Sequence, residues 1–198
     1  MRIISGKFKG TKLKMSDNKS TRPLKDMVRE SIFNFLIHSN KILFEIEKSN
    51  ILDLYSGTGS FGLECLSRKA KQVMFVENEK STAKILEKNI EKLKDKDVSK
   101  IFLEDSFKLI KEVESNIYSE FFNEKFDLIF FDPPFKNENM NTLIEMIAQK
   151  KILKKKGIVV LHRHKNTKDI LPSNFKIIDE RIYGLSKIIF GNFYLSSS

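Results

Sequence analysis

The stretch from Asn50 to Gly62 (NILDLYSGTGSFG) constrains the fold of this chain more than any other. Its short apolar run ends abruptly in glycine, a pattern typical of a buried parallel strand. Gly57, Gly59 and Gly62 would let the backbone turn tightly, approach a ligand and pack the next helix against the sheet. That helix, predicted over residues 60–68, begins with unpaired N–H groups and a positive dipole end. The stretch therefore predicts a strand–turn–helix unit that binds a nucleotide-like cofactor.

Composition limits the other possibilities. With 198 residues, 40% of them hydrophobic, the chain has room for one well-filled α/β domain and a small appendage. No apolar run is long enough to span a bilayer, and the start, MRIISGK, lacks the core of a signal peptide, so we expect a cytoplasmic protein. The single cysteine, Cys65, excludes a disulfide within the chain and is expected to serve packing. His38, His162 and His164 lack metal-ligand spacing, so we expect structural or surface histidines and no metal.

Positive charge is concentrated near the N-terminus. The net charge is +10, and residues 1–29 hold nine Lys/Arg against two acids. Such an arm fits a polyanion such as nucleic acid, and it fits equally a solvated tail in a lysine-rich chain. Alternating apolar and basic residues from Arg2 to Met15 predict a β-hairpin with one basic face. Thr21 and Pro23 predict a helix start. That helix would pack an apolar stripe made of Met27, Val28, Ser31, Ile32, Phe35 and Leu36.

Strand-like and helical periods alternate along the rest of the chain, as a doubly wound α/β sheet requires. A short helical piece over 42–48 leads into the strand at Asn50. We divide the chain into a basic hairpin-plus-helix extension, residues 1–48, and a cofactor-binding domain, residues 49–198. Further strands are predicted over 72–77, 100–104, 126–131, 157–161, 175–183 and 187–195, and a turn at Gly184 joins the last two. Helices are predicted over 80–94, from the end of the strand over 100–104 to residue 110, and over 142–151.

Acidic residues lie within or after several predicted strands, where ligands of an open parallel sheet bind. Glu77 lies twenty residues after Gly57, and its position at a strand end favours binding of ribose hydroxyls over a role as a surface acid. Asp105 could accept from an adenine amino group or cap the following helix, and both could hold. Asp53 would repel a pyrophosphate. It suits S-adenosylmethionine, which carries an ammonium and a sulfonium group.

The tetrapeptide Asp132-Pro133-Pro134-Phe135 follows the strand predicted over 126–131. It suits an exocyclic amino group on a base, whose nitrogen is a poor nucleophile because its lone pair is conjugated with the ring. Asp132 could accept one amino hydrogen and the Pro133 carbonyl another, while the prolines hold the turn rigid. Phe135 could stack on an extruded base, which is worth about 1–3 kcal/mol. An ordinary Asp-Pro turn with Phe135 in the core is the competing interpretation, and the position after a glycine-loop unit favours the functional one.

These motifs carry a resemblance to a known family. DPPF and ILDLYSGTGSFGLE resemble the class I S-adenosylmethionine-dependent amino-methyltransferases. MRIISGKFKGTKL and TRPLKDMVRESIFNFL resemble one family among them, the bacterial 16S ribosomal RNA guanine-N2 methyltransferases of the RsmD type. The resemblance runs from Met1 to about Gly184. It implies a Rossmann-like sheet of seven strands, mostly parallel with the last antiparallel, and a guanine in a helix-loop of 16S rRNA as target.

The resemblance also assigns residues. We predict cofactor binding by Asp53, Tyr55, Asn78, Ser106 and Asp132. The resemblance implies that Gly57 and Gly59 line the cofactor, that Glu77 binds its ribose and that Asp105 binds its adenine. It implies catalytic positions at Asp132, Pro133, Pro134 and Phe135. The arm would hold rRNA phosphates through Lys7, Lys9, Lys12, Arg22 and Arg29. After Tyr183 and Gly184 the chain reads Leu-Ser-Lys where the family more often has a polar turn such as Asp-Thr, so no contact is assigned to that turn.

The expected partner is 16S rRNA or the assembled small subunit. We expect the protein to be a monomer that does not bind a membrane. Three other functions compete with this one. A DNA adenine-N6 methyltransferase would use the same tetrapeptide chemistry, but the chain has no room for a separate DNA-recognition domain. A nicotinamide-dependent dehydrogenase explains the glycines and leaves residues 132–135 without a role. A non-catalytic RNA-binding module explains the basic arm but not the glycine loop.

Overall fold

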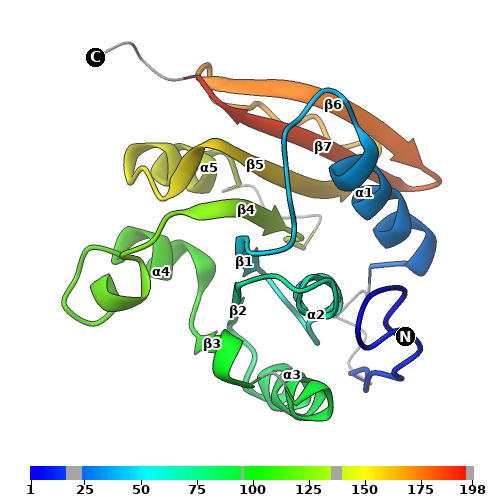
Figure 1. The fold of residues 1–198 in the computed structure, drawn as a ribbon. Helices are drawn as coiled ribbons and strands as arrows, with labels where there is room; N and C mark the ends of the chain where they lie inside the picture. The colour runs from blue at the N-terminus through cyan, green and yellow to red at the C-terminus, as the bar shows by residue number, and fades with distance from the viewer. Residues whose placement is uncertain (17–23, 95, 135–139, 195–198) are drawn as a thin grey trace.

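A computed structural model describes residues 1–16, 24–94, 96–134 and 140–194 (Figure 1). Its centre is a seven-stranded sheet with the order β3-β2-β1-β4-β5-β7-β6. The first five strands pair in parallel, and β7 is antiparallel to both of its neighbours, β5 and β6. This arrangement confirms the predicted sheet. The strands are β1 (Asn50–Leu54), β2 (Gln72–Glu77), β3 (Ser99–Leu103), β4 (Phe126–Phe131), β5 (Leu153–His164), β6 (Phe175–Tyr183) and β7 (Ser186–Phe193).

Helices cover both faces of the sheet. One face carries α1 (Asp26–His38), α2 (Ser60–Ser67) and α3 (Lys80–Leu93), and the other carries α4 (Ser106–Lys111) and α5 (Met140–Gln149) (Figure 1). Short 3-10 turns, η1 (Lys96–Val98) and η2 (Ser119–Phe121), precede β3 and β4. The apolar core is accordingly divided into two clusters, one on each face of the sheet.

An aromatic stack joins two of these helices to the sheet. The Phe61 ring on α2 lies between Phe33 of α1 and Phe130 of β4, with centroid distances of 5.1 and 4.0 Å. All three side chains are buried. The stack fixes α1 and α2 above the middle of the sheet, next to the glycine loop that precedes α2.

Helix α1 differs in two respects from the prediction. It begins at Asp26, later than Thr21 and Pro23, which lie outside the described residues. Met27 is 61% exposed and does not belong to the apolar stripe. At 100° per residue, Met27 lies on the side of the helix opposite to its buried positions, which are Val28, Arg29, Ile32, Phe33, Phe35 and Leu36.

Three other predicted elements also differ. The arm has a single antiparallel bridge, Arg2 to Lys12, and tight turns in place of a regular hairpin. Residues 42–48 are not helical. At their end Lys48 has a positive φ, and its N–H donates to the Lys69 carbonyl beyond α2. Strand β5 is longer than residues 157–161 at both ends, since Leu153 pairs with Phe126 of β4 and its last three residues pair with β7.

Buried polar side chains of the body hold the arm in place. The Glu64 carboxylate on α2 is fully buried and accepts the N–H groups of Ile4 and Ser5 at 2.8 and 2.9 Å. The Asn89 side chain on α3, also fully buried, accepts the Lys14 N–H at 2.7 Å and donates to the Lys14 carbonyl at 3.0 Å. These side chain–backbone bonds add to a short backbone ladder within the arm, in which the Ile3 N–H donates to the Thr11 carbonyl and the Leu13 N–H to the Met1 carbonyl. The boundary after residue 48 stays a prediction, since residues of the arm and of α1 share one core cluster with the sheet.

Gly6 allows the arm to approach α2. Its φ is +83°, and a Cβ at this position would lie 2.0 Å from the Ser67 carbonyl oxygen. Gly10 has a similar φ, +87°, but a Cβ there would meet nothing within 4 Å. We expect Gly6→Ala to lower the free energy of unfolding by about 3 kcal/mol, through both strain and the clash. Gly10→Ala should lower it by about 1–2 kcal/mol, from backbone strain alone.

Urea titration of both variants measures this difference. Equal losses of stability in the two variants would show that the arm does not depend on the contact between Gly6 and Ser67.

Candidate functional site

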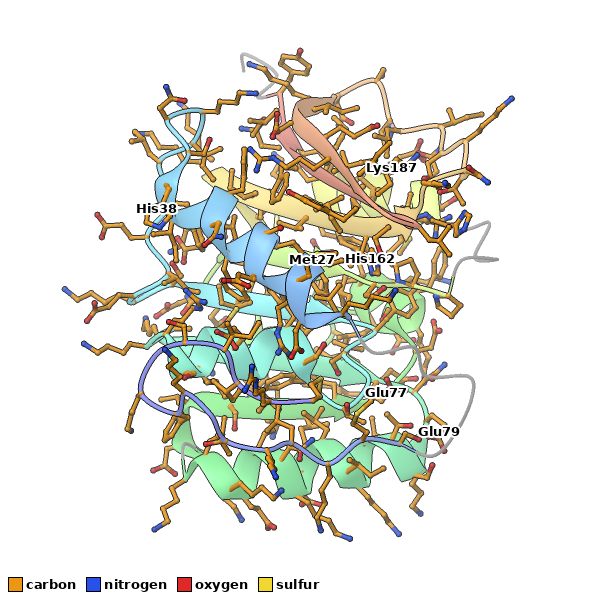
Figure 2. The ribbon with its side chains drawn as sticks, turned by 90° about the vertical axis from the view of Figure 1, so that its right-hand side faces the viewer. Met27, His38, Glu77, Glu79, His162 and Lys187 are labelled. Carbon is orange, nitrogen blue, oxygen red and sulfur yellow. The ribbon has the colours of Figure 1, made fainter. Side chains whose placement is uncertain are left out.

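The carboxyl ends of the central strands meet at one edge of the sheet. In the register, Leu54 at the end of β1 lies opposite Val76 of β2 and Phe131 of β4. The predicted residues Asp53, Glu77 and Asp132 therefore come to the same edge, and they are close enough for the charges of Glu77 and Asp132 to act on Asp53. Figure 2 shows Glu77 at this edge, together with Glu79, His162 and Lys187.

Asp53 is a buried carboxylate with one unused oxygen. It is 1% exposed, and its Oδ2 accepts the Gly62 N–H at 2.9 Å. Its Oδ1 has no hydrogen-bond partner among the described residues. Burial raises the pKa of Asp53 well above its usual value, and the charges of Asp132 and Glu77 add to the rise, although the Gly62 N–H opposes it. A buried acid of this kind would be stabilised in its charged form by a cationic ligand.

The glycine loop is held from β2 by Glu77. The Glu77 carboxylate accepts the Gly57 N–H through Oε2 and the Glu79 N–H through Oε1, both at 2.8 Å. Burial raises the pKa of Glu77, which is 8% exposed, while these N–H donors lower it. Each oxygen retains a second lone pair, so both could still accept a ribose hydroxyl. Tyr55, ahead of the loop, has a φ of +60°, a strained conformation typical of functional loops.

The residues after β2 and β3 occupy the rim of the site. Asp105 is exposed and caps α4, its Oδ1 accepting the N–H groups of Phe107 and Lys108 at 2.9 and 3.0 Å. The capping role is confirmed, and the contact with adenine stays a prediction. Ser106 is 3% exposed as the first residue of α4, whereas Asn78, after Glu77, is exposed.

The end of β4 places Asp132 beside β1. The Asp132 N–H lies 3.4 Å from the Leu54 carbonyl, and the Asp132 side chain is 19% exposed. Pro133 is buried and Pro134 is exposed. The predicted stacking residue, Phe135, lies outside the described residues. The carboxylate therefore lies at the same edge as the glycine loop, within reach of solvent.

His162 was missed as a residue of this site. Its Nδ1 lies 2.7 Å from Asp132 Oδ1, and its Nε2 lies 2.8 Å from Ser186 Oγ. The predicted strand over 157–161 ended one residue short of His162, and Ser186 lies in the turn to which no contact was assigned. Only the pairing of β5 with β7 brings the two residues together.

The arm exposes most of its predicted RNA-binding cations. Lys7, Lys9 and Lys12 are exposed, while Arg22 lies outside the described residues. The prediction for Arg29 was wrong. Its side chain is fully buried, and its guanidinium donates to the carbonyls of Arg2 and Ser60 and to Asp26. Arg29 is therefore not accessible to a phosphate and instead fixes the start of the arm to α1 and α2.

A row of lysines on α3 extends this basic surface. Lys84, Lys88 and Lys92 follow one another at intervals of four residues, and all are exposed. Lys92 Nζ donates to the Lys12 carbonyl at 2.9 Å, so the row borders the arm. The i, i+4 spacing in the sequence was a signal for this row, but only the docking of the arm shows that the two groups form one surface.

The described residues show neither a cluster of metal ligands nor a membrane-spanning helix. They contain no group of three or more His, Cys, Asp or Glu side chains arranged to hold a metal ion. No helix in the described part of the chain has the length and apolar character needed to cross a bilayer.

Comparison with known proteins identifies the family. The model of the family described as conserved hypothetical protein 95 matches residues 1–192. The chain belongs to this family. Ribosomal RNA small subunit methyltransferase D of Haemophilus influenzae, the protein for which RsmD is the short name, is 31% identical over 186 residues, which cover 93% of this chain and 90% of that protein.

Solved structures agree with this assignment. A methylase from H. influenzae superimposes with a TM-score of 0.74 at 30% identity, covering 96% of each chain. A methyltransferase structure from Escherichia coli has a TM-score of 0.77 at 23% identity, covering 99% of each chain, and supports the fold. This member of the RsmD family is an S-adenosylmethionine-dependent methyltransferase.

The site fits the cofactor of the RsmD family. The unpartnered Asp53 Oδ1 is a buried acceptor that suits a cationic group. A Cβ at Gly57, whose φ is +55°, would meet nothing within 4 Å, so the loop has open space beside it. A Cβ at Gly59, with φ +89°, would instead lie 2.4 Å from Leu86 Cδ1. Gly57 thus faces a space that a ligand can occupy, and Gly59 faces the core.

We expect Gly57→Ala and Gly59→Ala to separate cofactor binding from stability. Gly57→Ala should weaken binding of S-adenosylhomocysteine at least tenfold, because its methyl group fills space beside the loop, at a cost of about 1–2 kcal/mol in stability. Gly59→Ala should destabilise the fold more, because strain adds to the clash with Leu86. Calorimetric titration and thermal unfolding measure the two effects, and unchanged binding by Gly57→Ala would contradict this assignment.

Proposed function

We propose that this protein transfers a methyl group from S-adenosylmethionine to the exocyclic N2 of a guanine in small-subunit ribosomal RNA in the cytoplasm. The position of Asp132 and Pro133 carries the proposal, because they end β4 beside β1 and its glycine loop. Several relatives are named as methyltransferases of small-subunit rRNA. An amino nitrogen as the acceptor follows from the resemblance of residues 132–135 to amino-methyltransferases. Guanine N2 follows from the resemblance of MRIISGKFKGTKL and TRPLKDMVRESIFNFL to the guanine-N2 methyltransferases of the RsmD type.

Residues from three strands would hold the cofactor. Asp53 would offer Oδ1 to its cationic amino acid moiety, and Glu77 would offer both oxygens to the ribose. Asp105 would offer Oδ2 to an adenine amino group, since the cap of α4 uses Oδ1. Bound S-adenosylmethionine supplies an activated methyl group, which passes to the attacking nitrogen as its bond to sulfur breaks. Holding two reactants aligned can supply about 7–11 kcal/mol of barrier reduction, so positioning is the main contribution of these residues.

Asp132 and Pro133 would prepare the nitrogen. The Asp132 carboxylate accepts one amino hydrogen and the Pro133 carbonyl accepts the other, which favours a pyramidal nitrogen with its lone pair exposed. Methylation makes the nitrogen acidic, and its surplus proton passes to Asp132 or to water. No strong base is needed for this step.

The surface formed by the arm and α3 would bind the RNA backbone. Lys7, Lys9 and Lys12 are exposed on the arm, and Lys84 and Lys88 lie beside it on α3. Helix α3 starts just after Glu77 and Glu79 at the site edge, so the row of lysines leads away from the site along the helix (Figure 2). An RNA strand lying along these residues would reach the carboxyl edge of the sheet.

The same tetrapeptide chemistry also fits adenine N6 in DNA. The relatives named for a nucleic-acid substrate act on RNA, which favours RNA over DNA for this chain. The two substrates give different methylated nucleosides, so one experiment can distinguish them.

We expect methyl-labelled S-adenosylmethionine to label small ribosomal subunits or naked 16S rRNA, and the label to be recovered as N2-methylguanosine. Genomic DNA offered in parallel should stay unlabelled. Asp132→Ala should abolish labelling, by at least 100-fold, because its carboxylate would hold the amino group of the target base. Nucleoside analysis by mass spectrometry gives the product.

Two outcomes would contradict the proposal. Recovery of N6-methyladenine from DNA would show that the substrate is DNA and not rRNA. Full activity of Asp132→Ala would show that Asp132 takes no part in the reaction.

We expect the arm to contribute electrostatic affinity for RNA. The triple variant Lys7→Gln, Lys9→Gln and Lys12→Gln should make the slope of log K against log salt less steep by about 2, at roughly 0.7 for each phosphate that the arm no longer binds. Glutamine keeps the backbone bonds that dock the arm. Fluorescence anisotropy with an rRNA fragment between 50 and 300 mM salt measures the slope.

A matched control removes the same charge from the opposite edge of the sheet. Lys125, Lys155 and Lys156 are exposed near the amino ends of β4 and β5. Replacing these three with glutamine should leave the slope nearly unchanged. Equal effects of the two triple variants would show that RNA affinity depends on the net charge of the protein and not on the position of the arm lysines.

A further inference from the structure

Asp132 is the outer member of a chain of three polar side chains from three strands. His162 on β5 contacts Asp132 through Nδ1 at 2.7 Å and Ser186 on β7 through Nε2 at 2.8 Å. The Asp132 side chain is 19% exposed, whereas His162 and Ser186 are 4% and 5% exposed as residues. The chain therefore leads from the site at Asp132 into the sheet at Ser186.

This order of groups also occurs in serine hydrolases, where the hydroxyl faces the substrate. Here the burial is reversed, because the hydroxyl lies inside the sheet and the carboxylate faces solvent. Ser186 is therefore not placed to attack a substrate. The imidazole instead acts on the carboxylate.

The carboxylate determines which ring nitrogen carries the proton. An ionised Asp132 can only accept, so His162 Nδ1 must donate to Oδ1. In the neutral ring Nε2 is then an acceptor, and the Ser186 hydroxyl can donate to it. With both nitrogens engaged, the ring has one tautomer and one orientation.

Strand β7 makes this arrangement possible. His162 is paired with Ile188, and Ser186 is paired with His164, in the antiparallel register of β5 and β7. The hydroxyl thus comes from the strand next to β5 and lies behind the imidazole.

The backbone directly after Asp132 cannot hold its carboxylate. The residue that follows is Pro133, which has no backbone N–H to donate to the carboxylate.

We propose that His162 is a positioning residue for methyl transfer. It binds Asp132 Oδ1, holds the carboxylate in one rotamer, and leaves Oδ2 as the oxygen that accepts the guanine amino hydrogen. Ser186 in turn holds the His162 ring. This inference rests on the proposed function, in which Asp132 contacts the target base.

Two substitutions at one position test the inference. In His162→Asn the amide nitrogen can lie where Nδ1 lies and still donate to Asp132, whereas in His162→Gln it lies nearer the place of Nε2 and can reach only Ser186. We expect His162→Asn to retain most of kcat. His162→Gln should lose about 10- to 100-fold in kcat, because the carboxylate is no longer fixed. The KM for RNA and the affinity for S-adenosylhomocysteine should stay near those of the parent protein in both variants.

Asp132→Ala separates the two levels of the argument. If Asp132→Ala stays active, the proposed function fails, and this inference fails with it. If Asp132→Ala is inactive while His162→Asn and His162→Gln fall equally, or neither falls, the proposed function stands and the positioning role of His162 is overturned.

A measurement on the parent protein does not depend on the activity of any variant. Long-range proton–nitrogen correlation spectra report whether each ring nitrogen of a histidine carries a proton, and His162→Asn assigns the signal. A proton on Nδ1 of His162 in the parent protein supports the inference, and an Nδ1 without a proton overturns it.

Discussion

The hydrogen bond from the Gly62 N–H to the buried Asp53 carboxylate joins the central strand to the helix that follows the glycine loop. A Cβ at Gly62 would lie 2.2 Å from the Phe75 ring, so α2 can approach the sheet this closely only without a side chain there. The close approach brings Phe61 into its stack with Phe33 and Phe130. It also fixes both ends of the glycine loop. The carboxylate that makes this bond keeps its other oxygen for the cofactor, so the same residue serves both the fold and the site.

Buried polar side chains also hold the arm through hydrogen bonds. Glu64 and Asn89 are fully buried, yet their polar atoms are engaged by arm backbone groups rather than left without partners. Such bonds avoid the penalty of an unsatisfied buried group. Asn89 also donates to the Thr58 carbonyl at 3.0 Å, so one side chain touches the arm and the glycine loop. The arm is therefore part of the folded body, and its lysines are displayed from a fixed backbone.

The sequence predicted those parts whose signal is local. The bounds of β2 and β4 match the predicted residues, because apolar runs flanked by turn residues mark them. Those of β6 match because the turn at Gly184 marks its end. Glu77 and Asp132 were placed correctly at strand ends by the same logic. Arg29 was misjudged because its burial depends on the carbonyls of Arg2 and Ser60, which only the docked arm brings near. His162 was missed because its partner, Ser186, lies 24 residues away and depends on strand register.

The strand order has a consequence for how this protein is made. Strand β7 is the last in the chain, yet it lies between β5 and β6, both of which are synthesised earlier. The arm is synthesised before α2 and α3, the helices that bind it, and the last residue known to contact it is Lys92. The arm therefore cannot dock when it is first synthesised, and β6 cannot join the sheet before β7 is synthesised. A nascent chain that ends before residue 186 would carry the glycine loop and Asp132 but lack the hydroxyl behind His162 and the strand that closes the sheet, so we expect the site to be completed only after β7 has left the ribosome.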